Sequence, residues 1–314
     1  MVRQRKIVPD LIKILCTVGI LFHHYQQFTG TYFFNFINFY GGKFSSGYLV
    51  EVFFLISGWA ILPYVNRIKN NMSFKDFYKK RLIRLLPSMI AFTLLYVIAI
   101  KTYAHFCGDN FAFSSKIDVF GTIVTALGLG SWGITNNYYI NNVCWYVSVL
   151  LFCYLLMYIL VFISNRAKIS AYVLFLLPVI VGVVYNCFFK TTYLPFFTEG
   201  LSRGYIHFFG GLILSMLVSQ LCQKHELKLN QNKKNTPSFF SVMITNISEA
   251  LLDIYLVQLI VLLGFFLLAH FKGIKLVSGK TMLLYAFTTF VVGYLYNLLI
   301  GKRIYKLLTD KFDQ

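Results

Sequence analysis

Eight apolar stretches, each close to the length of a helix that crosses a bilayer, constrain this chain more than any other feature of its sequence. Such a helix needs roughly 20 residues to cross about 30 Å of hydrocarbon. Only 13% of the 314 residues are charged, about half the share found in soluble domains. We therefore expect an all-α fold, a polytopic bundle of transmembrane helices in which residues 1–314 form a single membrane-embedded domain. The stretches are Val8–Phe28, Gly47–Val65, Leu85–His105, Val143–Ser164, Ile169–Phe189, Gly204–Cys222, Val242–His270 and Lys280–Ile300.

A ninth apolar stretch, Ile117–Leu129, decides how the chain is threaded through the membrane. It is short and interrupted by glycine. If it crossed as one additional span, two basic segments would lie on the side of the membrane opposite the basic N-terminus. These are the segment after Gly204–Cys222 and the segment near the C-terminus. The positive-inside rule therefore favours an even number of crossings, either eight with a re-entrant piece or ten. Both termini are then expected in the cytoplasm. The deciding cations are Arg3, Arg5, Lys6, Lys224, Lys228, Lys233, Lys234, Lys302, Arg303 and Lys306.

The excess of basic residues has a different meaning here than in a soluble protein, where it would suggest a nucleic-acid partner. The formal net charge is +18, from 29 Lys and Arg against 11 Asp and Glu. These cations lie in short loops between apolar stretches, where they set orientation and meet membrane lipids, so we expect no nucleic-acid partner. The six cysteines have no CxxC or other metal-site spacing, so no metal site is expected.

Three ionisable residues lie within the first two stretches: Lys13, His24 and Glu51. Such groups are costly in lipid and are treated as site candidates. Eleven residues are about three helical turns, so Lys13 and His24 share one face of the first helix, roughly 16 Å apart. Glu51 lies at a depth similar to that of His24, where a carboxylate can orient an imidazole base. Alternatively, Lys13 reaches the headgroups and Glu51 is an interfacial helix-start residue.

Two further sets of charged residues are candidates. Arg81 and Arg84 lie three residues apart at the cytoplasmic surface, a geometry suited to phosphate oxygens. On the local sequence alone, attraction to anionic headgroups is the preferred explanation. His207 lies one turn after Arg203, so both side chains are expected to face the same outer side of the bundle.

Together these residues resemble the acyltransferase-3 family of bacterial membrane enzymes. The first stretch matches its basic residue and later histidine with Lys13 and His24, and the second matches in Val50–Gly58, where Glu51 stands where Asp is commoner. The cytoplasmic Arg-x-x-Arg before a proline matches Arg81, Arg84 and Pro87.

Later matches to the family are looser. Trp145 begins a segment that resembles the family's Trp-Ser-Leu motif, but Leu150 stands where the family has Glu. Arg203 begins a segment that resembles its Arg–Phe–Gly span, and Gln258 stands where a late motif has His. We assign Trp145, Arg203 and His207 to binding of the acceptor substrate.

The resemblance implies transfer of an acyl group, acetyl above others, from cytoplasmic acyl-CoA to a hydroxyl of a cell-surface or lipid-linked glycan. The enzyme would be a multi-pass protein of the bacterial cytoplasmic membrane, an acyltransferase of groups other than aminoacyl, with no tightly bound cofactor. Arg81 and Arg84 would bind the CoA phosphates and Lys13 would help to hold the donor. His24, oriented by Glu51, would be the general base.

Two other functional classes remain open at this point. A flippase or exporter of glycans, without acyl chemistry, also uses intramembrane Lys, His and Glu for proton relays. The pair Arg81 and Arg84 favours the acyl-CoA enzyme, because an exporter does not need it. A purely structural membrane subunit leaves Lys13, His24 and Glu51 unexplained.

Overall fold

A computed structural model describes residues 7–30, 38–41, 45–108, 117–134, 140–190, 192–224 and 238–312. Within these ranges the fold is all-α, and eight helical segments are long and apolar enough to cross a membrane, as predicted. The helices are α1 (Ile7–Thr29), α2 (Leu49–Lys69), α3 (Phe74–Cys107), α4 (Val119–Ala126), α5 (Cys144–Ala167), α6 (Ala171–Phe188), α7 (Glu199–Lys224), α8 (Phe239–Lys272), α9 (Gly279–Tyr296) and α10 (Lys302–Phe312), and a π-helical turn, η3 (Asn297–Gly301), joins the last two.

The ninth apolar stretch does not cross. Its helix, α4, has 8 residues, far fewer than a crossing requires. The chain after α4 passes Gly128, which lies against Leu86 of α3 and Leu151 of α5. It then returns along α5, where the backbone N–H of Ser131 donates to Ser148 Oγ over 3.0 Å. A helix this short, followed by a return along α5, is compatible with the re-entrant piece expected from the charges.

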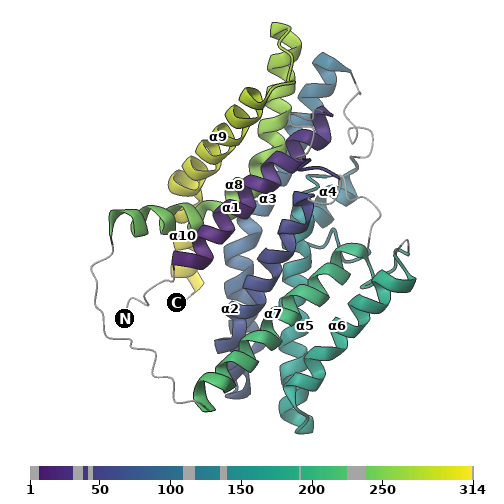
Figure 1. The fold of residues 1–314 in the computed structure, drawn as a ribbon, viewed down its shortest axis with the longest axis vertical. Coiled ribbons are helices and arrows are strands. Elements are labelled where there is room, and N and C mark those ends of the chain that lie inside the picture. Colours follow the sequence, from purple (N-terminus) through teal and green to yellow (C-terminus); the bar gives the residue numbers. More distant parts are fainter. Residues whose placement is uncertain are drawn as a thin grey trace.

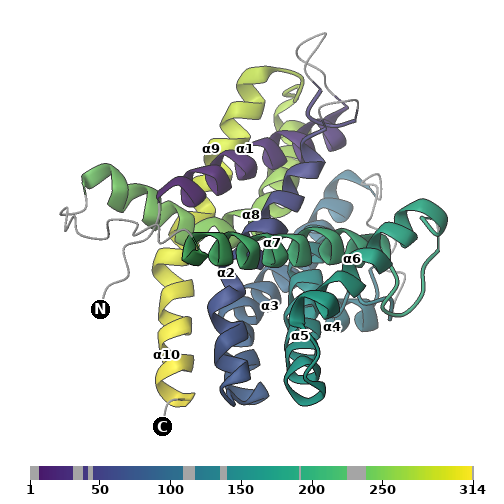
Figure 2. The same ribbon diagram turned by 60° about the horizontal axis from the view of Figure 1, so that its bottom comes forward.

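With an even number of crossings, we expect both ends of the chain on the same side of the membrane. In Figure 1 the first turn of α1 and helix α10 lie below the middle of the molecule, and in Figure 2 α10 extends downward from the level of α1 to the C-terminus. The last turn of α2 and that of α7 point toward this end as well. We expect this end to face the cytoplasm, an expectation that rests on loop charges. Several of these, including Arg3, Lys228 and Lys234, lie outside the described residues.

The helices form two groups joined through a central pair. Helices α1, α8 and α9 gather on one side and α5, α6 and α7 on the other, with α2 and α3 between them (Figures 1 and 2). Helix α2 contacts α1, α5 and α7, and α3 contacts α5 and α8. Residues placed on α2 can therefore face either group.

Helices α2 and α7 approach unusually closely because small residues face each other at their crossing. A Cβ atom at Gly58 would overlap the carbonyl of Phe208, and one at Gly211 would overlap the carbonyl of Leu55. Glycine at such positions lets helix backbones touch, which is how helices in membranes gain packing contacts. The crossing fixes the register of α2 against α7, and this register positions the site described next.

The start of α3 follows from its cap. Ser73 is the N-cap, and its Oγ accepts a hydrogen bond from the backbone N–H of Asp76 over 3.1 Å. With 34 residues, α3 is longer than a bilayer requires. Its basic first turns therefore have length to extend beyond the hydrocarbon, where Lys75 and Lys80 are exposed.

Candidate functional site

A partly buried ion pair joins α2 to α7. Glu51 Oε1 accepts from Arg203 Nε over 3.1 Å, and Arg203 Nη2 donates to the carbonyl of Gly47 over 2.8 Å. The guanidinium group lies over the ring of Trp145 on α5, 4.7 Å from its centroid. Glu51 and Arg203 lie about two helical turns before Gly58 and Gly211, so the close crossing of α2 and α7 brings them together.

His207 completes this cluster on the other side of the carboxylate. Its Nδ1 lies 2.8 Å from the carbonyl oxygen of Arg203, to which it must donate, because a carbonyl oxygen only accepts. Its Nε2 faces Glu51 Oε2 at 3.7 Å, an ion-pair distance when the ring is protonated. Of the three residues expected to bind acceptor, Arg203 and His207 flank Glu51, and Trp145 lies against the Arg203 guanidinium. Their role in binding stays a prediction.

His24 is buried, with 8% of its surface exposed, and its partner lies on α8. Its Nδ1 is 2.9 Å from Gln258 Oε1, while Gln258 Nε2 donates to the carbonyl of Tyr255 over 2.7 Å. That second bond fixes the orientation of the amide, so the oxygen faces the ring and His24 Nδ1 must be the donor. The neutral ring then carries an unprotonated Nε2, which makes no hydrogen bond to any described residue.

The expected pair between His24 and Glu51 is not formed in the structure. Glu51 turns to Arg203 of α7, and His24 turns to Gln258 of α8. Equal depth does not make two side chains meet, because the rotation of each helix about its axis decides which neighbour a residue faces. The hypothesis that Glu51 orients His24 directly was therefore wrong. Gln258, noted only as a departure from the family pattern, is the orienting residue.

His23 links the two clusters. Its Nδ1 lies 2.7 Å from the carbonyl oxygen of Phe39, and its ring meets that of His24 edge to face, with centroids 5.2 Å apart. A Cβ atom at Gly47 would lie 2.8 Å from its Cε1. Gly47 in turn accepts the hydrogen bond of Arg203, so His24 and the ion pair belong to one continuous site.

The two arginines at the other end of the bundle are not equivalent. The Arg81 guanidinium is buried between Tyr64 and Phe77, 3.9 and 4.0 Å from their ring centroids, and its Nη1 donates to the carbonyl of Phe77 over 2.9 Å. Arg84 is exposed. The expectation that both guanidinium groups face the aqueous surface is wrong for Arg81. Its position faces inward because the first turns of α3 pack against α2 and α5, where aromatic faces replace water.

Lys13 is held at the start of α1. Its Nζ lies 3.4 Å from Asp10 Oδ1, one turn earlier on the same helix. The hydroxyl of Ser248 on α8 donates to the same carboxylate oxygen over 2.6 Å. About a quarter of the Lys13 side chain is exposed, so it is neither buried with His24 nor free in solvent.

A comparison with known protein families covers most of the residues described above. The model of an acyltransferase domain matches residues 7–230. The chain belongs to the acyltransferase-3 family. It is accordingly a membrane acyltransferase with many spans. No curated protein and no solved structure matches it significantly. The matched part contains His24, Glu51, Arg84 and Arg203 but ends before α8, which supplies Gln258.

This member of the acyltransferase-3 family holds buried polar residues that the sequence reasoning missed. Asp253 of α8, with 3% of its surface exposed, accepts from Asn297 Nδ2 over 2.7 Å. Asn297 begins the π-helical turn η3. Asn141, fully buried, donates to the carbonyl of Leu256 over 3.3 Å. Asp253 could have been found by the rule that marked Lys13, because it is an acid within a long apolar stretch.

Proposed function

We propose that this acyltransferase transfers an acyl group, acetyl above others, from cytoplasmic acyl-CoA to a hydroxyl of a cell-surface or lipid-linked glycan. The site would lie in the cytoplasmic membrane of a bacterium. The observation that carries the proposal is the state of His24: buried, oriented through Nδ1 by a neutral amide, and left with an unprotonated Nε2. Such a nitrogen is suited to take the proton of an alcohol.

The proposed acyl transfer needs no reactant besides acyl-CoA and the sugar hydroxyl. His24 Nε2 takes the hydroxyl proton while the sugar oxygen attacks the thioester carbonyl carbon. The bond from that carbon to sulfur breaks, the CoA thiolate leaves, and the imidazolium returns the proton to sulfur. Gln258 holds the ring tautomer throughout, which makes it a positioning residue.

The cluster on α2, α5 and α7 fits the acceptor. Sugars present many hydroxyl groups, each of which both donates and accepts. Glu51 and His207 offer acceptors, and the Arg203 guanidinium has donors beyond the two engaged with Glu51 and Gly47. Trp145 supplies a flat apolar face beside them. The cluster lies near the start of α2, the end expected to face outward.

The donor would approach from the opposite end. Arg84 is exposed and can bind a CoA phosphate, whereas Arg81 acts by holding α3 against Tyr64 of α2. Lys13 would steer the pantetheine arm along the face of α1 that leads to His24. Only an extended, narrow part of the donor has to enter the bundle in this arrangement.

The test compares surface glycans and purified variants. Mass spectrometry of glycans with and without the gene should show the loss of an ester. His24→Ala should lower acyl transfer by about 10²- to 10⁴-fold, the usual cost of losing a general base. His23→Ala is the matched control and should be much milder, because its Nδ1 bond to Phe39 serves the loop rather than the reacting group. Active His24→Ala protein would refute the mechanism, and glycans that are exported but never esterified would favour an exporter.

A further inference from the structure

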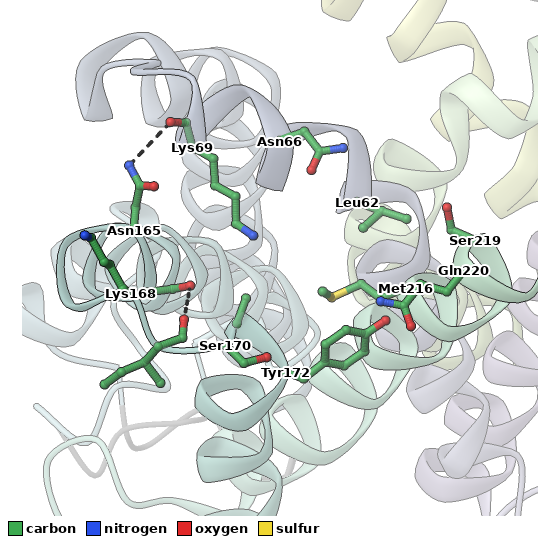
Figure 3. Close-up of a pocket in the computed structure, with 13 residues that line it drawn as sticks. Leu62, Asn66, Lys69, Asn165, Lys168, Ser170, Tyr172, Met216, Ser219 and Gln220 are labelled. Atoms are coloured by element: carbon green, nitrogen blue, oxygen red, sulfur yellow. Dashed lines mark hydrogen bonds between the residues drawn. The ribbon is translucent and has the colours of Figure 1, made fainter. Parts of the chain in front are cut away.

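A cavity of about 670 Å³ opens at the end of the bundle that we expect to face the cytoplasm. It lies between the last turns of α2, the turn from α5 to α6, and the last turns of α7 (Figure 3). We call it the basal cavity and define it by Leu62, Asn66, Lys69, Lys168, Tyr172 and Gln220, which line it with seven others. No residue of the proposed acyl-transfer site lines it.

The charge of the basal cavity has one sign. Lys69 and Lys168 line it, and none of the described lining residues is Asp or Glu. In Figure 3 the Lys69 side chain extends into the open space below Asn66, while Lys168 stands at the outer rim. Neither ammonium group forms an ion pair or a hydrogen bond with the part of the chain that the structure describes. Two unpaired cations around one concave space attract an anion.

The walls add hydrogen-bond donors to this charge. The Tyr172 hydroxyl is buried and has no hydrogen-bond partner among the described residues. The amide groups of Asn66 and Gln220 and the hydroxyl of Ser219 line the same space. The rim is held in place, since Asn165 Nδ2 donates to the carbonyl of Lys69 over 3.4 Å. Phosphate oxygens accept several hydrogen bonds at once, and lysine binds them as a point charge.

The basal cavity is separate from Arg84 and its buried neighbour. Leu62, Asn66 and Lys69 recur at helical spacing and form one face of α2. Tyr64, which covers the Arg81 guanidinium, points to α3 on another face of the same helix. Helix α2 therefore stands between the cavity and the place where we expect the donor phosphates.

We propose that the basal cavity binds the phosphate group of an anionic ligand through Lys69, assisted by Lys168 and the hydroxyl of Tyr172. Two sources carry this chemistry: the headgroup of an anionic phospholipid, which basic pockets between membrane helices bind, and a soluble nucleotide phosphate. Lys69 ends α2, so we expect its ammonium near the boundary between headgroups and water, within reach of both.

The experiment measures phosphate binding directly. All proteins also carry Arg84→Ala, which removes the phosphate contact at the expected donor site. One arm titrates the purified protein with 3′-phosphoadenosine 5′-phosphate by calorimetry. The other measures retention of phosphatidylglycerol by native mass spectrometry after reconstitution in phosphatidylcholine. Lys69→Ala should weaken binding of one probe by about 10- to 100-fold, the value of a charge-assisted contact. Lys306→Ala with Lys311→Ala is the matched control, since both are exposed lysines of α10.

Each result decides the proposal. Loss of lipid retention in Lys69→Ala, with the control unchanged, supports a headgroup site, and loss of nucleotide binding supports a soluble phosphate. The proposal is overturned if neither probe binds more tightly to the Arg84→Ala protein than to its Lys69→Ala derivative. It is also overturned if the α10 control loses binding equally. Because acyl transfer is not measured, these outcomes are independent of the proposed function.

Discussion

Replacing Glu51 and Arg203 singly and together with alanine should reveal a strong coupling between the two side chains. Their Nε to Oε1 distance is 3.1 Å, and the side chains are 21% and 20% exposed. Either single change leaves the other charge without its partner in a mostly apolar bundle. The double change removes both charges, so it should destabilise the protein by clearly less than the sum of the two single changes.

The size of the coupling follows from the geometry. Unit charges at this separation attract by about 5 kcal/mol at an effective dielectric constant of about 20. Desolvation and the one-fifth exposure of each side chain reduce this value. A hydrogen bond to a charged group contributes about 1.5–3 kcal/mol. We therefore expect a coupling of roughly 1.5–3 kcal/mol between Glu51 and Arg203.

Unfolding in mixed micelles measures the free energies of the four proteins in the cycle. A second cycle, Glu51→Ala with His24→Ala, is the control, since these residues have different partners and should be additive within about 0.5 kcal/mol. The reasoning would be refuted if Glu51 coupled to His24 and not to Arg203. That result would restore the direct pair expected from depth alone.

Three more predictions test other parts of the structure. Arg84→Ala should raise KM for acyl-CoA about tenfold or more with the fold intact, whereas Arg81→Ala should lower the melting temperature, because its guanidinium is buried between aromatic rings. Gly211→Ala should destabilise the protein by about 1–3 kcal/mol through overlap with α2, whereas Gly210→Ala, whose Cβ would have no described atom within 4 Å, should not; equal melting curves would contradict this packing. A reporter fused after Lys306 should be cytoplasmic, and an external signal would contradict the even number of crossings.

The number of crossings could be predicted from sequence because hydropathy and loop charge act locally. Each apolar stretch reports its own preference for lipid, and the cations beside it report orientation. The same local reasoning marked Ile117–Leu129 as the weakest of the apolar stretches and required an even number of crossings. These features need no knowledge of what a helix touches.

The side-chain partners could not be predicted in this way. Glu51 and Arg203 are far apart in the chain, and only the close crossing at Gly58 brings them together. The inward rotation of Arg81 likewise depends on how α3 packs against α2 and α5. Hydropathy averages over the circumference of a helix, so it carries little information on which face meets which neighbour.

The amide of Gln258 constrains where a proton can go. Unlike a carboxylate or a second imidazole, the Gln258 amide cannot take up or release a proton. His24 can therefore exchange a proton only through Nε2. In the proposed reaction the hydrogen removed from the sugar must therefore leave on the departing thiol. Neutral alcohol and thioester become neutral ester and thiol, and no net charge moves through the bundle. Turnover should then be independent of the membrane potential, although the proposed reaction would carry the acyl group from one side of the membrane to the other.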